Sequence, residues 1–437
     1  MNKYHTAIIG AGPAGYTAAL KIAAAGKSVC LIDKDREELG GTCLNRGCIP
    51  VKSFLESANL YQKIKSADSF GIKVTGEEVN FDKIKEKSNK NIALLKKGVL
   101  FLLKSKKITL EFGQASFVSD QKIQLKNGDN TKEIEADNFI LATGSLPKRL
   151  PNLDIDNKKI FDSSGLCKNL PQAKNILIVG GGYIGCEFAH FYNSLGSEVT
   201  IVDIAESLLP GQDKDITKAL AKEFKKKGIK VLTSHKTTQE EVDKFDIVIV
   251  AVGREPNTGS LNLEKAGIEL ENNFIKVDKN FKTTAGNVYA VGDLINTPML
   301  AHVAFSEGNL TANSILGNIV EGINYNLVPE VIFTEPQIAS FGLKEAEAER
   351  ENLAIEVSKN LFRANAKAHI LGQIAGFSKL IFGKKDKKLI GASIIGPEAT
   401  ELIHTLVAFA KSDATKSEIE KSIYAHPTLS EIFSGPT

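Results

Sequence analysis

The sequence predicts an α/β fold that contains two units of parallel sheet. Two observations support this prediction. The pattern Gly-x-Gly-x-x-Gly occurs at residues 10–15 and again at residues 180–185, each time after an apolar run typical of a buried strand. An acidic residue, Asp33 or Asp203, ends a second apolar run 23 positions after the first glycine of each copy. The chain therefore contains a large internal repeat of strand, helix and strand.

Composition limits the classes of protein that fit. A chain of 437 residues is too long for one ordinary core and should divide into about three domains. Its 42% hydrophobic residues, 24% charged residues and net charge of +3 describe a soluble globular protein, without the basic excess of a nucleic-acid binder. No run of apolar residues is long enough for a membrane span. Five cysteines and no secretory signal favour a reducing compartment, so we expect a cytoplasmic location.

Both glycine patterns predict dinucleotide binding. The glycines allow a tight turn and close approach of a pyrophosphate to a helix N-terminus, while the acid accepts hydrogen bonds from a ribose. In the second unit, Asp203 would repel a 2′-phosphate, and no arginine occupies residues 204–210. That unit should therefore prefer NAD to NADP. The glycines concerned are Gly10, Gly12 and Gly15 in the first copy and Gly180, Gly182 and Gly185 in the second.

Further signals assign the first unit to a flavin. The strands predicted at residues 139–144 and 288–293 place polar groups at the carboxyl end of a parallel sheet, where ligands bind in this architecture. A new helix is predicted to begin at residues 299–302, and its N-terminus could stabilise negative charge on a reduced isoalloxazine.

Cys43 and Cys48 form the most distinctive short motif. On an ideal helix such positions lie about 8.6 Å apart, whereas a disulfide needs Cα atoms within roughly 4.4–6.8 Å. If the two cysteines bond, the segment between them is not regular helix, and Asn45 and Gly47 tolerate such a backbone. A catalytic pair, a structural pair and a chance spacing all stay open. A metal site is the weaker option because the other three cysteines are scattered, so no metal is predicted.

A third candidate site lies near the C-terminus. His426 could act as a general acid and base, with Glu431 orienting its imidazole. Alternatively, Thr428 and Glu431 form a capping box that starts a terminal helix. Both interpretations can hold at once.

These motifs, in their order along nearly the whole chain, resemble the flavin-dependent pyridine nucleotide–disulfide oxidoreductases. Residues 333–339 and 391–402 also resemble that family's interface domain. The resemblance implies two Rossmann-like FAD/NAD(P)-binding domains plus a C-terminal α+β dimerisation domain, in a homodimer. We expect the FAD-binding domain at residues 1–149 and 277–322, the NAD-binding domain at residues 150–276 and the dimerisation domain at residues 323–437.

The resemblance also implies roles for the site residues. Cys43 would exchange with a dithiol substrate, and Cys48 would lie against the flavin as a thiolate. Lys52 would lie near the flavin, paired with Glu187, and His426 of the partner subunit would take the substrate proton. The other FAD residues would be Gly10, Gly12, Gly15, Asp33, Lys34, Gly41, Thr42, Gly113, Ala142, Thr143, Gly144, Ser145, Asp293, Met299, Leu300, Ala301 and His302. NAD would contact Gly180, Gly182, Tyr183, Ile184, Gly185, Asp203 and Gly253, with a mobile Tyr183 covering the flavin until NAD displaces it.

The activity implied by this resemblance is oxidation of protein-bound dihydrolipoamide to lipoamide, with NAD as acceptor. The implied partners are the lipoyl domains of a 2-oxoacid dehydrogenase complex or of the glycine cleavage system. Residues 53–58 offer a mostly apolar, neutral lining suited to a lipoyl chain. Two alternatives stay open: an NADH-dependent reductase of another disulfide, such as a coenzyme A disulfide, and a mainly structural flavoprotein subunit of a multienzyme complex.

The second unit departs from the family pattern. Residues 108–141 give the first unit room for an antiparallel excursion, but only residues 233–245 are available at the matching place in the second. We expect two or three strands to be missing there, which would shorten the NAD-binding domain.

Overall fold

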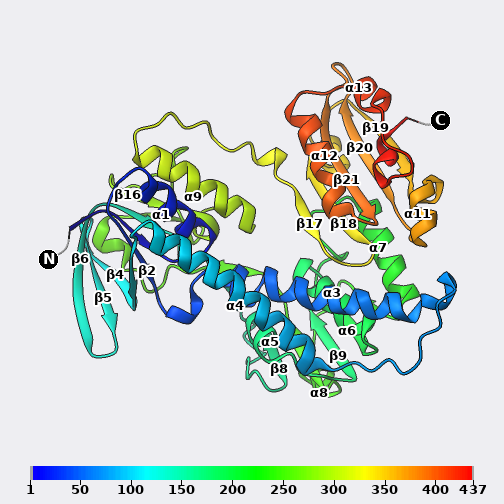
Figure 1. The fold of residues 1–437 in the computed structure, drawn as a ribbon, viewed down its shortest axis with the longest axis horizontal. Coiled ribbons are helices and arrows are strands. Elements are labelled where there is room, and N and C mark those ends of the chain that lie inside the picture. The colour runs from blue at the N-terminus through cyan, green and yellow to red at the C-terminus, as the bar shows by residue number, and fades with distance from the viewer. Residues whose placement is uncertain (1–2, 436–437) are drawn as a thin grey trace.

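A computed structural model describes residues 3–435 and arranges them in three units, each built on its own sheet (Figure 1). The first unit holds the N-terminal end of the chain and the third unit holds the C-terminal end. Within residues 3–435, no helix has the length and apolarity needed to cross a bilayer.

The first sheet has seven strands, and its parallel part carries the first glycine turn. β6 is long enough to pair with β1 and β16 through its second half, while its first half pairs with the antiparallel hairpin β4–β5. The predicted excursion is therefore confirmed. The strands are β1 (Lys3–Ile9), β2 (Val29–Asp33), β3 (Thr109–Phe112), β4 (Gln114–Ser119), β5 (Lys122–Asn127), β6 (Asn130–Leu141) and β16 (Val288–Ala290).

Two helices, α1 (Pro13–Ala24) and α9 (Ala301–Ile315), pack side by side in the first unit (Figure 1). Gly308 permits this approach, because a Cβ there would lie 2.3 Å from the carbonyl oxygen of Ala14. α9 begins at Ala301, as the sequence predicts for a helix starting at residues 299–302.

The second sheet is wholly parallel, in the order β11-β10-β9-β12-β8. Residues 233–246, all of which the structure describes, connect β11 to β12 through one short helix and contain no strand. The predicted loss of the antiparallel excursion is therefore confirmed. The elements are β8 (Ile160–Asp162), β9 (Asn175–Val179), β10 (Glu198–Val202), β11 (Lys230–Leu232), β12 (Ile247–Val250), α5 (Ser163–Asn169), α6 (Tyr183–Ser194), α7 (Lys214–Lys226) and α8 (Gln239–Asp243).

Two antiparallel strands, β7 (Ser145–Pro147) and β13 (Arg254–Pro256), carry the chain out of the first unit and back to it. A small hairpin, β14 (Leu270–Glu271) and β15 (Phe274–Ile275), follows. Leu261 and Ile275 are buried in the core of the first unit, although they precede residue 277. The chain thus rejoins the first core soon after β13.

Three further helices extend from the first unit: α2 (Gly41–Arg46), α3 (Cys48–Lys65) and α4 (Phe81–Ser105). Phe54, Leu55 and Ala58 of α3 are buried in the core of the second unit, where the Phe54 and Phe191 ring centroids lie 5.7 Å apart. The prediction that residues 53–58 line a substrate path is wrong, because α3 uses this apolar face to pack against α6.

The third unit is an antiparallel sheet in the order β17-β18-β21-β20-β19, with α12 packed on it. Its core gathers apolar side chains from α12 and the sheet, such as Ile403, Leu406, Phe341 and Ile394. The elements are β17 (Glu330–Ile332), β18 (Gln337–Gly342), β19 (Ile355–Leu361), β20 (Phe377–Gly383), β21 (Leu389–Gly396), α10 (Glu345–Arg350), α11 (Ala366–Leu371), α12 (Ala399–Lys411) and α13 (Lys416–Lys421).

Candidate active site

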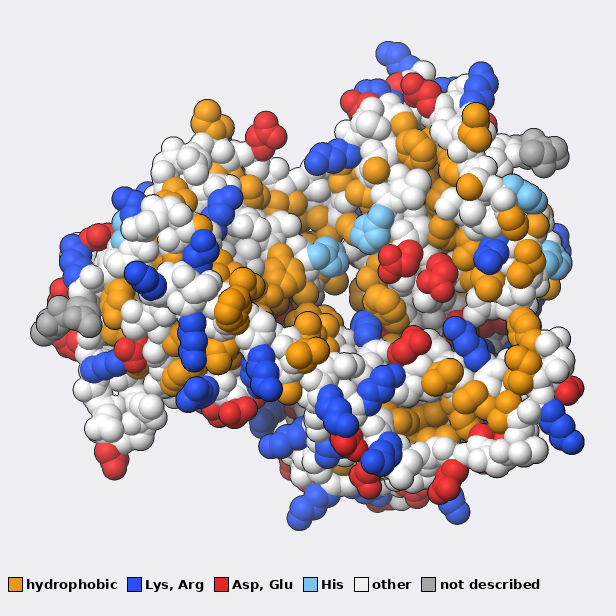
Figure 2. All heavy atoms as spheres, viewed as in Figure 1, with side chains coloured by type: hydrophobic (Ala, Val, Ile, Leu, Met, Phe, Trp, Pro, Cys, Tyr) orange, Lys and Arg blue, Asp and Glu red, His pale blue; other side chains and the backbone are white. Residues whose placement is uncertain are grey.

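A cavity of about 2060 Å³ is lined by residues of all three units and contains most of the predicted site. Figure 2 shows the molecule deeply hollowed at the centre of one face, between the units. Every predicted cofactor residue except Gly15 and Gly185 lines the cavity, and so do Cys43, Cys48 and Glu187. Residues far apart in the sequence therefore meet in one space.

The first glycine turn forms a cradle without side chains. A Cβ on Gly41 would lie 2.6 Å from the Cα of Gly12, so only glycine fits at this contact. Gly15 lies behind the turn, where a Cβ would come within 1.8 Å of the Gly10 carbonyl oxygen. It acts through close helix packing, which is why it does not line the cavity. Such a cradle fits the pyrophosphate of a dinucleotide.

Asp33 braces this turn from the end of β2. Its carboxylate accepts hydrogen bonds at 2.7 Å from the backbone N–H groups of both Ala11 and Lys34. Burial raises the pKa of Asp33, and these N–H groups oppose that effect. Since each carboxylate oxygen can accept more than one hydrogen bond, Asp33 still has capacity for a ribose hydroxyl.

The second turn repeats this arrangement. Asp203 accepts hydrogen bonds from the N–H groups of Gly181, at 2.5 Å, and Ala205, at 2.7 Å. A Cβ on Gly185 would lie 1.9 Å from the Gly180 carbonyl oxygen, so Gly185 also lies behind its turn. The internal repeat seen in the sequence is thus a repeat of backbone geometry.

The chain breaks its helix between the two cysteines. α2 ends at Arg46, Gly47 has φ −143° and ψ −113°, and Cys48 begins α3. Of the two residues that could tolerate an irregular backbone, Gly47 has it. Asn45 is helical, and its side-chain amide donates to three carbonyl groups, those of Glu38, Leu39 and Gly41.

Both cysteines are free thiols in this structure, and their environments differ. A hydrogen bond from the Cys43 thiol lowers the pKa of Cys48 to about 7, against the effect of burial, and the charge of Lys52 lowers it further. The same hydrogen bond and burial raise the pKa of Cys43. Cys48 is therefore the sulfur that carries negative charge in the reduced pair, and it is the better leaving group.

The predicted contact between Lys52 and Glu187 is present. The Lys52 ammonium lies 2.8 Å from both oxygens of Glu187, a side chain that is only 5% exposed. Glu187 also accepts a hydrogen bond at 3.1 Å from the backbone N–H of Phe333, just after β17. The buried Glu187 thus fixes the positive charge of the partly exposed Lys52 one helical turn from Cys48 on α3.

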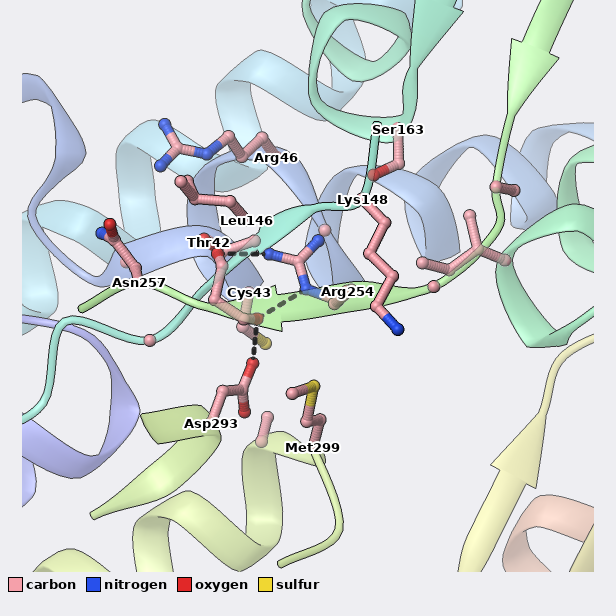
Figure 3. A pocket seen from close by; sticks show the side chains of 18 of the residues that line it. Thr42, Cys43, Arg46, Leu146, Lys148, Ser163, Arg254, Asn257, Asp293 and Met299 are labelled. Carbon is pink, nitrogen blue, oxygen red and sulfur yellow. Dashed lines mark hydrogen bonds between the residues drawn. The ribbon is translucent and has the colours of Figure 1, made fainter. Parts of the chain in front are cut away.

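A second polar cluster joins β7, β13 and Asp293 (Figure 3), and of its residues only Arg254 is missing from the sequence-based predictions. The Arg254 guanidinium donates at 2.7 Å to both the hydroxyl and the carbonyl oxygen of Ser145, whose hydroxyl donates to Asp293. Burial lowers the pKa of Arg254, and Asp293 opposes that effect. The sequence offered no local signal for Arg254, because its partners are more than 30 residues away.

His426 lies outside the cavity of its own chain. Its Nδ1 lies 2.8 Å from a Glu431 oxygen, and its side chain is 70% exposed. The capping box between Thr428 and Glu431 is also present, but it begins a 3₁₀ helix (Leu429–Phe433). Glu431 thus contacts the His426 imidazole as predicted. Neither residue lines the cavity of its own chain.

Comparison with known proteins gives the family. Residues 4–308 match pyridine nucleotide-disulphide oxidoreductase, and residues 328–435 match its dimerisation domain. A protein named dihydrolipoyl dehydrogenase from Bacillus subtilis is 41% identical, covering 97% of this chain and 96% of its own. Another of that name, from Geobacillus stearothermophilus, is 37% identical over 98% and 94% of the two chains.

Solved structures share the fold of this chain over nearly its whole length. The HOCl-induced flavoprotein disulfide reductase RclA from Escherichia coli, in its Cu(II) complex, has a TM-score of 0.89 at 26% identity, covering 99% of this chain and 98% of its own. LpdA from Mycobacterium tuberculosis also has a TM-score of 0.89 at 26% identity, over 98% and 97% of the chains. The chain therefore belongs to the pyridine nucleotide–disulfide oxidoreductases, enzymes that use FAD and NAD, and it carries the family's dimerisation domain.

Proposed function

We propose that the chain oxidises protein-bound dihydrolipoamide to lipoamide, with NAD as the final electron acceptor. The observation that carries the proposal is the asymmetric cysteine pair, with Cys48 lowered in pKa beside Lys52, in a cavity that reaches both glycine turns. The choice of dithiol is supported by relatives named dihydrolipoyl dehydrogenase that align with nearly the whole chain.

The reaction begins with the Cys43–Cys48 pair as a disulfide. A substrate thiolate attacks the sulfur of Cys43, the bond between the two cysteines breaks, and Cys48 leaves as a thiolate. The second substrate sulfur then attacks the first, which releases the Cys43 sulfur and closes the lipoamide ring. The substrate loses two electrons to the cysteine pair and two protons, one of which ends on the Cys43 sulfur as its thiol. We assign removal of a substrate proton to His426 of the partner subunit, oriented by Glu431.

Lys52 and the Cys43 thiol stabilise the Cys48 thiolate once it forms. When bound, FAD and NAD supply the two-electron acceptor chemistry that returns the pair to the disulfide. We place FAD at the first glycine turn, with Asp33, Lys52 and Asp293, and NAD at the second, with Tyr183 and Asp203. The glycine cradles described above fit both groups.

We propose an FAD-binding domain, an inserted NAD-binding domain and a dimerisation domain close to the predicted boundaries. The burial of Leu261 and Ile275 supports re-entry into the first domain before residue 277. We further propose a homodimer, supported by the match to the dimerisation domain. The partners would be lipoyl domains of a 2-oxoacid dehydrogenase complex or of the glycine cleavage system. The low number of cysteines, five in 437 residues, is in keeping with a cytoplasmic location.

The decisive test compares kcat/KM for dihydrolipoamide with kcat/KM for the reduction of other disulfides, such as a coenzyme A disulfide. We expect kcat/KM to be higher for dihydrolipoamide than for the other disulfides. It also expects Cys48→Ser to retain bound FAD and lose lipoamide turnover. Turnover by that variant, or a preference for another disulfide, would reject this assignment.

A further inference from the structure

The third unit contributes a wall to the cavity beside the second glycine turn. Glu330, at the start of β17, and Tyr183, the first residue of α6, both line the cavity. The Tyr183 hydroxyl donates a hydrogen bond at 2.6 Å to a Glu330 carboxylate oxygen. A residue of the dimerisation segment thus holds the aromatic side chain that follows the glycines.

Gln212 contacts both Tyr183 and Glu330, so the three side chains form a triangle of hydrogen bonds. Its side-chain N–H group donates to the Tyr183 hydroxyl at 3.0 Å and to Glu330 at 2.5 Å. Its side-chain oxygen accepts at 2.8 Å from Ser340, which is fully buried. Glu330 and Ser340 face each other in register on β17 and β18. The third unit therefore binds both the nitrogen and the oxygen of the Gln212 side-chain amide.

Gln212 cannot move together with the Tyr183 phenol if the phenol is displaced. The next residue, Asp213, accepts a hydrogen bond from Ser393 at 3.0 Å and lies 3.0 Å from the Lys379 ammonium. Lys379 and Asp213 are each only 2% exposed. Because the segment that carries Gln212 is anchored in the core, displacing the phenol must break both of its hydrogen bonds.

The residue that follows β17 also positions the Glu187–Lys52 pair. Tyr183 and Glu187 lie one turn apart on α6, and they are held by Glu330 and by the backbone N–H of Phe333, three residues apart. Tyr183 thus lines the same cavity as the second glycine turn and Lys52, and a pyridine nucleotide bound at that turn would share this space with the phenol.

We propose that Glu330 and Gln212 are positioning residues that set the affinity for the pyridine nucleotide by holding the Tyr183 phenol inside the cavity. The inference rests on the proposed function to the extent that the nucleotide binds at the second glycine turn. A protein whose binding-competent form is a minor fraction binds its ligand more weakly by that fraction. Removing the hydrogen bonds should therefore tighten nucleotide binding.

The test uses the holoenzyme, mixed anaerobically with increasing NADH in a stopped-flow instrument, and follows the bleaching of flavin absorbance. Neither a dithiol nor a disulfide substrate is needed. We expect the apparent dissociation constant for NADH to fall about tenfold in Tyr183→Phe, and by a smaller factor in Gln212→Met, which keeps the hydrogen bond between Tyr183 and Glu330. The limiting rate in Gln212→Met, a change outside the cavity lining, should stay within about twofold of wild type. The double variant should match Tyr183→Phe, because that change alone removes both hydrogen bonds of the phenol.

Tyr192→Phe is the matched control. This phenol lies on the same helix, is fully buried and donates at 2.9 Å to the carbonyl oxygen of Pro171, away from the cavity. It should leave the dissociation constant for NADH unchanged. An unchanged or raised constant in both Tyr183→Phe and Gln212→Met would overturn the inference alone. A wild-type flavin that NADH does not reduce would overturn the proposed function, and this inference with it.

Discussion

Removing the charge of Lys52 should protonate Cys48. The two residues are one helical turn apart on α3, a spacing that brings Cβ atoms to about 5–6 Å. An opposite charge at this distance changes an ionisation constant by about 10- to 1000-fold. Taking the middle of that range, Lys52→Met lowers the thiolate fraction of Cys48 at about pH 7 from about one half to about one hundredth.

Only the thiolate reacts with iodoacetamide, so alkylation of Cys48 should be ~50-fold slower at that pH. The assay uses reduced protein freed of FAD, with the rate measured across a pH series. Trypsin cleaves after Arg46, between the two cysteines, and mass spectrometry then reports each thiol separately.

Two variants bracket the effect. Lys52→Arg keeps the positive charge and should keep the wild-type pH profile. Glu187→Gln removes a carboxylate that raises the pKa of Cys48, so its profile should move to lower pH. If Lys52→Met alkylates at the wild-type rate near neutral pH, the electrostatic account of Cys48 is refuted, and the hydrogen bond from Cys43 alone sets its acidity.

Three other perturbations test separate parts of the molecule. Gly185→Ala forces a Cβ against a carbonyl of the second turn, so an NADH titration should show at least about tenfold weaker binding with bound FAD unchanged. Random pairing of Cys43→Ser chains with His426→Gln chains should restore about a quarter of wild-type turnover, whereas either variant alone stays inactive, if the histidine serves its partner. Lys379→Met leaves the buried Asp213 carboxylate without its cation and should destabilise the fold by ~3–5 kcal/mol in chemical unfolding. Burial lowers the pKa of Lys379, but its carboxylate partners raise it above 10.5 overall, so wild type should lose this advantage only as the pH rises through that value.

The parts of the fold that the sequence predicts well are those set by local backbone constraints. The glycine turns and the break at Gly47 depend on residues that tolerate unusual geometry, and such residues are visible in any sequence. The short connection between β11 and β12 is likewise a matter of counting residues.

The wrong and missing predictions concern contacts between side chains that lie far apart in the sequence. Residues 53–58 have the apolar character of a substrate lining, but the position of α6 decides that they are core. Glu330, Gln212 and Arg254 have no distinctive local pattern, and their partners are more than 25 residues away along the chain. Only the folded arrangement of three units reveals them.

The pairing of β7 with β13 makes the second unit a detachable insert. Its entry and exit strands are hydrogen-bonded in register, with Leu146 opposite Glu255, and the Lys148 N–H donates to the Gly253 carbonyl at 3.0 Å. A segment whose two ends lie side by side can be exchanged without stretching the host sheet. The geometry suits recombination as a way to change nucleotide preference, provided that the grafted unit supplies a carboxylate for Lys52 at the place of Glu187 and an apolar α6 face for α3.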